Sequence, residues 1–177
     1  MKNKIYILLL LAIIACAQPQ PRKPVVKKTS TFLTESIERN KAINKAEENI
    51  FKSLMEADSL NTYIASSNGF WYYYDKVDTV ATRLPVRGDE VVYEYQINNV
   101  NGDLIYSKEE LGVRSYLVDK QELITGLQDG LKLMKEGEEV TFLFPSHKAY
   151  GYSGYKNITG NQPLIYKVKL KEIIATK

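Results

Sequence analysis

The residues of this chain that could do chemistry are aromatic and aliphatic rather than nucleophilic. The one histidine, His147, has no cysteine, aspartate or serine arranged with it, and we interpret it as an exposed structural histidine. The stretch from Gly126 to Gly151 is richer, because its apolar residues recur at regular spacing and lead to a loop that begins at Tyr150. Without a nucleophile or a general base beside them, such residues would act by non-covalent binding.

Two apolar patterns predict the elements that position these residues. A short helix is indicated by apolar residues at helical spacing, with polar residues between them: Leu123, Ile124, Leu127, Leu131 and Met134. A half-buried strand follows, because Val140, Phe142 and Phe144 alternate with more polar positions. The chain then enters the glycine-containing loop after Tyr150.

Further strands are predicted on both sides of this stretch. They cover the aromatic run 69–74, the alternating segment 91–97, residues 104–106, residues 116–118 and the lysine-alternating segment 164–170. Asn101-Gly102 is a strong turn signal and predicts a hairpin. Many antiparallel strands with one helix indicate an α+β fold, in which residues 67–177 form one globular domain.

The order and spacing of these motifs resemble the FKBP-type peptidyl-prolyl cis–trans isomerases over roughly residues 69–174. The resemblance implies a curled antiparallel β-sheet wrapped on one short helix, and an isomerase that needs neither metal nor cofactor. It implies catalytic roles for Tyr95, Ile124, Leu127, Tyr150 and Tyr166. It also implies substrate-binding roles for Ile105, Tyr106, Leu123 and Ile158. In this family the backbone N–H at the Ile124 position and the hydroxyl at the Tyr150 position bind the substrate.

An apolar pocket suits this reaction. Rotation about a peptide bond has a barrier of ~18–20 kcal/mol, because resonance must be broken. The twisted amide has lost resonance, so its carbonyl is less charged than in the planar ground state. A dry, apolar site can therefore bind the twisted state more tightly than either planar isomer.

Three positions depart from the family pattern and keep a second function open. Leu127 stands where the family has a tryptophan, Tyr106 stands where it has an aspartate, and Thr159-Gly160 replaces a pair of prolines. Loss of an aromatic floor costs ~0.5–1.5 kcal/mol of ring contact. The alternative to the isomerase is therefore a catalytically weak proline-binding chaperone or assembly scaffold.

The N-terminal residues predict export and a lipid anchor. Residues 1–16 are predicted to be a lipoprotein signal peptide. The apolar run Ile5–Ile14 is too short to span a bilayer, and Cys16 ends a sequence that resembles the bacterial lipobox. Cys16 is the predicted lipidation site, and as the single cysteine it excludes an intramolecular disulfide. Residues 17–33 then form a basic, proline-rich tether. The nearly balanced charge, 24 basic against 21 acidic residues, gives no indication of nucleic-acid binding.

Residues 34–66 are predicted to be a helical segment, with Thr34 as the N-cap of a helix that reaches about Leu60. Its apolar stripe comprises Ile43, Ile50, Phe51, Leu54 and Met55. We expect this stripe to pack on the following domain of a monomer, with a dimer through residues 34–60 as the alternative.

The whole arrangement resembles the gliding-motility-associated FKBP-type isomerase lipoproteins of gliding bacteria. This resemblance implies a protein of the bacterial cell envelope, lipid-anchored to a membrane and facing the periplasm. It would act there on proline-containing exported or cell-surface polypeptides.

Overall fold

The computed structural model describes residues 29–175 of the chain. The predictions for the signal peptide, for Cys16 and for most of the tether concern residues outside this part. The chain divides into two compact units, Met1–Ser36 and Ile37–Lys177, and only residues 29–36 of the first are described. No helix among the described residues is long and apolar enough to cross a membrane.

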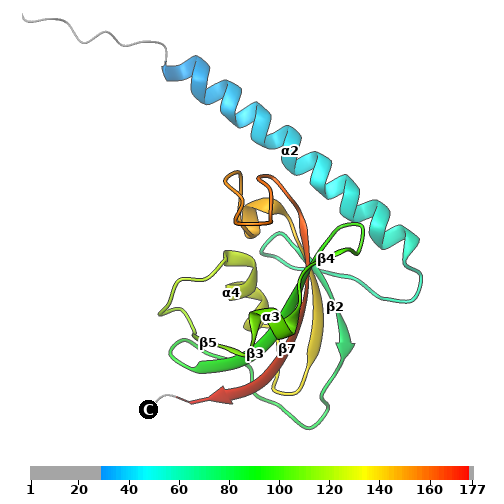
Figure 1. The fold of residues 1–177 in the computed structure, drawn as a ribbon, viewed down its shortest axis with the longest axis vertical. Coiled ribbons are helices and arrows are strands. Elements are labelled where there is room, and N and C mark those ends of the chain that lie inside the picture. Colours follow the sequence, from blue (N-terminus) through cyan, green and yellow to red (C-terminus); the bar gives the residue numbers. More distant parts are fainter. Residues whose placement is uncertain (1–28, 176–177) are drawn as a thin grey trace, which may run out of the picture. The chain divides into compact units, whose positions relative to one another are not determined.

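Antiparallel strands form a single curved sheet, with short helical elements between them (Figure 1). The strands are β1 (Ile64–Ala65), β2 (Trp71–Lys76), β3 (Glu90–Asn99), β4 (Leu104–Tyr106), β5 (Arg114–Leu117), β6 (Glu139–Phe144) and β7 (Leu164–Ile174). Their order is β1-β2-β6-β7-β3-β4, and β5 also pairs with β3. The helical elements are α2 (Thr29–Ala57), α3 (Lys108–Leu111), α4 (Thr125–Leu131) and the 3₁₀ turn η1 (Ser146–Lys148). The predicted α+β class and the hairpin at Asn101-Gly102 are therefore confirmed.

Two glycines allow α4 to lie very close to the sheet. A Cβ atom added to Gly126 would lie 2.8 Å from the ring of Phe144, and one added to Gly130 would lie 3.0 Å from the ring of Phe142. The ring faces therefore pack directly on the helix backbone, and Leu127 and Leu131 are almost completely buried beside them. This close contact fixes α4 against β6, so the residues at its N-terminus have a defined position.

The prediction that the strand around Val140–Phe144 is half-buried was wrong. Thr141 and Leu143, on the face expected to be exposed, are each only 1% exposed. The reason is that β6 lies between β2 and β7, and its second face is covered by α2, whose Phe51 packs against Leu143. A local sequence pattern does not reveal that a second layer covers a strand.

The helix α2 also differs from its predicted limits. Its described part already begins at Thr29, before the predicted N-cap Thr34, because residues 29–33 contain neither glycine nor proline to prevent a helix. It ends at Ala57, and Ile64–Ala65 near the end of the predicted helical segment form strand β1. Phe51 of the apolar stripe is fully buried against the chain's own domain, as expected, whereas Ile50 remains 42% exposed.

Candidate functional site

All nine residues predicted for the pocket lie in or against one apolar cluster between α4 and the sheet. Four are buried in it, and five are partly exposed at its edge. The buried four are Tyr106, Leu127, Ile158 and Tyr166, and the partly exposed five are Tyr95, Ile105, Leu123, Ile124 and Tyr150. They come from β3, β4, β7, the start of α4 and the loop after η1. The fold therefore brings together residues that are up to about seventy positions apart in the sequence.

Parallel aromatic rings form one wall of this site. The rings of Tyr95 on β3 and Tyr166 on β7 stack with their centroids 5.6 Å apart and an interplanar angle of 7°. The ring of Phe144 also contacts that of Tyr166, with centroids 5.2 Å apart and an interplanar angle of 57°. An ordinary phenol is already neutral at physiological pH, and burial raises the pKa of Tyr95 and that of Tyr166 further, so both keep a proton that can be donated.

Two donor groups of the site form no hydrogen bond of ordinary geometry with the described residues. One is the buried hydroxyl of Tyr166, which has only a loose contact with the hydroxyl of Tyr150. The backbone N–H of Ile124, just before α4, likewise donates to no group in the described part of the chain. An unsatisfied buried polar group costs ~1–3 kcal/mol, so the Tyr166 hydroxyl is costly unless a ligand meets it, whereas the Ile124 N–H lies at the partly exposed edge of the cluster.

Tyr150 is held by the backbone on both of its sides. The carbonyl oxygen of Ser146 accepts hydrogen bonds from the N–H groups of Ala149 and Gly151, at 3.0 and 2.8 Å. The ring of Tyr150 stacks on that of Tyr155, with centroids 5.3 Å apart and an interplanar angle of 11°. The sequence analysis missed Tyr155, because no spacing rule connects two residues of an irregular loop.

Tyr106 holds the loop as well as lying in the cluster. Its ring is buried, and its hydroxyl accepts a hydrogen bond from the backbone N–H of Asn157 at 3.2 Å. Ile158, the next residue, is 3% exposed and exchanges two backbone hydrogen bonds of 2.8 Å with Tyr155. The side chain that replaces the family's aspartate therefore stabilises the loop that carries Tyr155 and Ile158.

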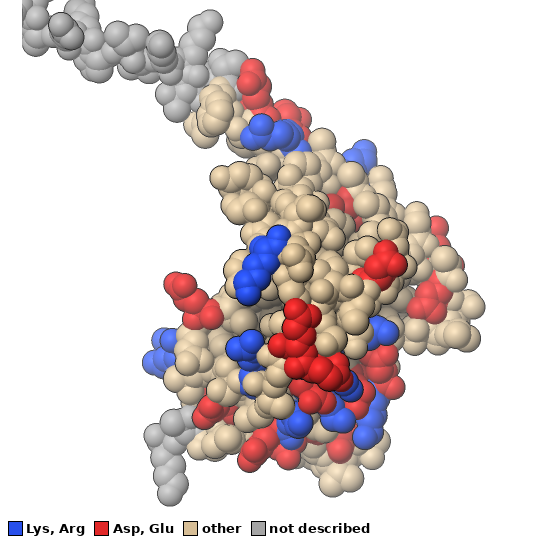
Figure 2. Space-filling view, in the orientation of Figure 1, with Lys and Arg blue, Asp and Glu red and all other residues tan. Residues whose placement is uncertain are grey.

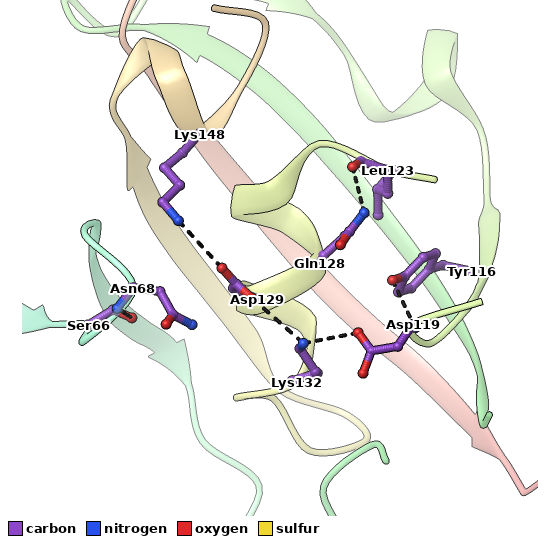
Figure 3. Close-up of polar contacts among 9 residues, drawn as sticks. All are labelled: Ser66, Asn68, Tyr116, Asp119, Leu123, Gln128, Asp129, Lys132 and Lys148. Atoms are coloured by element: carbon purple, nitrogen blue, oxygen red, sulfur yellow. Dashed lines mark hydrogen bonds and ion pairs between the residues drawn. The ribbon is translucent and has the colours of Figure 1, made fainter. Parts of the chain in front are cut away.

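Polar contacts fasten α4 on both of its flanks (Figure 3). Asp129 pairs with Lys148 of η1 at 3.6 Å, and Lys132 pairs with Asp119 at 3.1 Å. The amide of Gln128 donates to the carbonyl of Leu123 at 2.7 Å, which fixes the chain entering the helix. Partly exposed ion pairs each contribute only ~0–1 kcal/mol, so these contacts orient the helix more than they stabilise it.

The described residues contain no group of three or more metal-ligating side chains. His147 is exposed, as predicted, and partial burial lowers its pKa. Acidic and basic side chains are intermixed over the lower part of the face in Figure 2. One further carboxylate, Glu47 of α2, is 3% exposed; the sequence analysis missed it, because it is one of several glutamates in a polar helix.

Known proteins resemble this chain in sequence. The family model for FKBP-type peptidyl-prolyl cis–trans isomerases matches residues 81–171, just over half of the chain. The probable FKBP-type peptidyl-prolyl cis–trans isomerase FkpA of Neisseria meningitidis is 25% identical over 162 residues, which cover 90% of this chain and 58% of that protein. The FK506-binding protein 4 of Emericella nidulans is 36% identical over 86 residues, covering 49% of this chain and 18% of that protein. The chain thus spans less than two thirds of the length of these relatives.

Solved structures show the same fold. The crystal structure of FkpA from Escherichia coli matches with a TM-score of 0.61 and 20% identity, over 100% of this chain and 84% of that one. A peptidyl-prolyl cis–trans isomerase from Pseudomonas syringae matches with a TM-score of 0.60 and 20% identity, over 76% of this chain and 96% of that one. The predicted FKBP-like architecture is therefore confirmed. With its motifs, its fold and its family match in agreement, the chain belongs to the FKBP-type peptidyl-prolyl cis–trans isomerase family.

Proposed function

We propose that this chain catalyses cis–trans isomerisation of X–Pro peptide bonds at the site built around Tyr95, Ile124 and Tyr150. The observation that carries the proposal is the combination of an aromatic wall with unpaired donors. The rings of Tyr95 and Tyr166 stack in the same cluster as Ile124, whose N–H has no acceptor among the described residues. The hydroxyl of Tyr166 has only a loose contact with that of Tyr150. A prolyl ring with its flanking carbonyls offers the matching apolar surface and acceptors.

The proposed mechanism is selective binding of the twisted amide. The prolyl ring lies against the aromatic wall, while the Ile124 N–H and the Tyr150 hydroxyl bind the carbonyls of the substrate. The apolar surroundings disfavour the charge-separated planar amide and favour the twisted state. Each ~1.4 kcal/mol gained by the twisted state over the planar one increases the rate about tenfold.

The place of action is part of the same proposal. The lipobox-like sequence ending at Cys16 supports a lipid anchor, and the basic, proline-rich residues after it support a tether. The clients would be proline-containing exported or cell-surface proteins in the bacterial envelope, and the resemblance to gliding-motility lipoproteins extends them to surface machinery. Replacing the acylated residue, Cys16→Ser, should release the protein from isolated membranes; persistent membrane attachment would contradict the anchor.

A proline-binding chaperone with little turnover is the second candidate. Two features favour it: Leu127 gives α4 an aliphatic floor, and the hydroxyl of Tyr106 is engaged with the backbone of Asn157. Such a protein would bind prolyl segments through the same wall and donors but would not lower the barrier.

One assay separates the two candidates. The full-length chain in detergent is tested on a series of X–Pro peptides, for both isomerisation rate and affinity, with Tyr150→Ala as the control. Acceleration that falls in the control supports the isomerase, and affinity without acceleration supports the chaperone. If the chain is an isomerase, Leu127→Trp should raise the isomerisation rate by up to about tenfold, because it restores an aromatic ring contact. No gain would count against the role given to Leu127.

A further inference from the structure

The buried carboxylate of Glu47 is not part of the apolar cluster but is connected to it. Glu47 is on α2 and is 3% exposed. Its two oxygens accept hydrogen bonds from the hydroxyl of Ser146 at 2.6 Å and from the backbone N–H of Ser146 at 2.8 Å. Within the described part of the chain no lysine, arginine or histidine forms a salt bridge with it.

A buried carboxylate without an ion pair contributes little net stability to the attachment of a helix. Burial of a charge without an ion pair is costly, and a well-packed apolar residue usually stabilises such a position as well or better. The attachment of α2 already has an apolar contact one turn later, where Phe51 is fully buried against Leu143 and Trp71. Docking of the helix alone therefore does not account for Glu47.

Ser146 connects this carboxylate to Tyr150. The N–H and the hydroxyl of Ser146 donate to Glu47, whereas its carbonyl oxygen accepts from the N–H groups of Ala149 and Gly151. These two residues are the neighbours of Tyr150 in the chain. In Figure 1 the loop that follows, drawn in orange, lies beside α2.

We propose that Glu47 is a positioning residue for Tyr150, so that the helix α2 forms part of the proline-binding site. Glu47 fixes Ser146, and the carbonyl of Ser146 binds the N–H groups of the residues before and after the tyrosine. The proposal rests on the proposed function only in its use of Tyr150 as a substrate contact. A displacement of a substrate contact by about 1 Å can lower a rate by as much as ~100-fold, so a remote hydrogen bond of this kind has a measurable effect.

The test is a double-mutant cycle in the full-length chain, with kcat/KM and the affinity for an X–Pro peptide as readouts. Glu47→Ala should lower both roughly tenfold or more. Glu47→Ala combined with Tyr150→Ala should be no worse than Tyr150→Ala alone, because the two changes act through one contact. Glu48→Ala is the matched control: its exposed carboxylate pairs with Lys52 at 2.8 Å, and its loss should change neither readout by more than about twofold.

The outcomes separate positioning from a general structural role. Additive losses in the double variant, or Glu47→Ala within about twofold of the wild type, would overturn the proposal. The single tryptophan, Trp71, lies 5.7 Å from Phe51, so its emission reports whether α2 is still docked. If Glu47→Ala is not folded, Glu47→Gln and Ser146→Ala take its place in the cycle, each with one of the two hydrogen bonds retained. A wild-type chain without turnover contradicts the isomerase proposal alone, because the cycle is then decided by affinity.

Discussion

The two faces of strand β6 differ in whether their buried polar groups have hydrogen-bond partners. On the α2 face three carboxylates have partners: Glu47 binds Ser146, Asp58 accepts from the hydroxyl of Tyr63 at 2.8 Å, and Asp75 accepts from Thr141 at 2.6 Å. On the α4 face the cluster is larger, yet it leaves the Tyr166 hydroxyl without a hydrogen bond of ordinary geometry, with only a loose contact to Tyr150.

This difference distinguishes a structural face from a binding face. Paired polar groups cost little, whereas an unpaired donor costs ~1–3 kcal/mol of stability. That cost is explained on the α4 face if a ligand supplies the missing acceptor. The predictions below test the comparison in order of the expected size of the effect.

Truncating neighbouring residues of β6 compares the two faces directly. Phe142→Ala should lower the free energy of unfolding by about 3–5 kcal/mol, because its ring packs on Gly130 within the large cluster. Leu143→Ala, in the smaller cluster under α2, should cost about 2–3 kcal/mol. Urea denaturation measures both. An equal or larger loss at Leu143 would mean that the α2 face carries the main core.

A glycine substitution tests the close contact of α4 with the sheet. Helix propensity alone predicts that Gly126→Ala stabilises the protein by up to ~1 kcal/mol. The 2.8 Å contact with Phe144 predicts the opposite sign, a loss of about 1–3 kcal/mol from overpacking. Thr125→Ala, at the exposed neighbouring position, serves as the control. A more stable Gly126→Ala protein would show that α4 is looser than described.

Asp89 is a buried carboxylate with partners, so its replacement measures how much a paired polar group contributes to stability. The backbone N–H of Val86, and then Arg83, hold the pKa of Asp89 below its ordinary value of 3.8. Its contribution is therefore complete above the unfolded pKa and is lost as the pH falls through the lower folded pKa. Asp89→Asn should cost about 1–2 kcal/mol at pH 7 and much less near pH 2. A difference that does not depend on pH would contradict this assignment.

Removing one hydroxyl at a time gives effects of opposite sign. Tyr166→Phe should raise the free energy of unfolding by about 1 kcal/mol, because the buried hydroxyl that it deletes has only a loose contact with Tyr150 and no hydrogen bond of ordinary geometry. Tyr106→Phe should lower it by about 1 kcal/mol, because it deletes the acceptor for the Asn157 N–H. Thermal unfolding of the two variants is compared with the wild type. A loss of stability in Tyr166→Phe would mean that this hydroxyl has an internal partner after all.

Local patterns predicted the elements of the α4 face well. The spacing of Leu127 and Leu131 indicated α4, the turn Asn101-Gly102 indicated the hairpin, and the order of motifs brought nine residues to one cluster. These signals are local or come from a family resemblance, so they are present in the sequence itself.

Features that depend on packing between distant segments were not predictable in the same way. The burial of Thr141 and Leu143 requires a helix from a different part of the chain. The bonds of Glu47 to Ser146 join residues 99 positions apart. The stacking of Tyr155 on Tyr150 depends on the conformation of an irregular loop. None of these contacts leaves a periodic signal.

The most direct test of the central claim removes one hydrogen-bond donor of the site. Ile124 has φ −56°, which proline adopts, and its N–H has no acceptor within the described residues, so Ile124→Pro deletes the donor without breaking an internal hydrogen bond. Its kcat/KM for X–Pro peptides is compared with that of Ile124→Val, which keeps the N–H. The account predicts a rate at least about tenfold lower than that of Ile124→Val. Equal rates in two folded variants would contradict it, because the Ile124 N–H would then not bind the substrate.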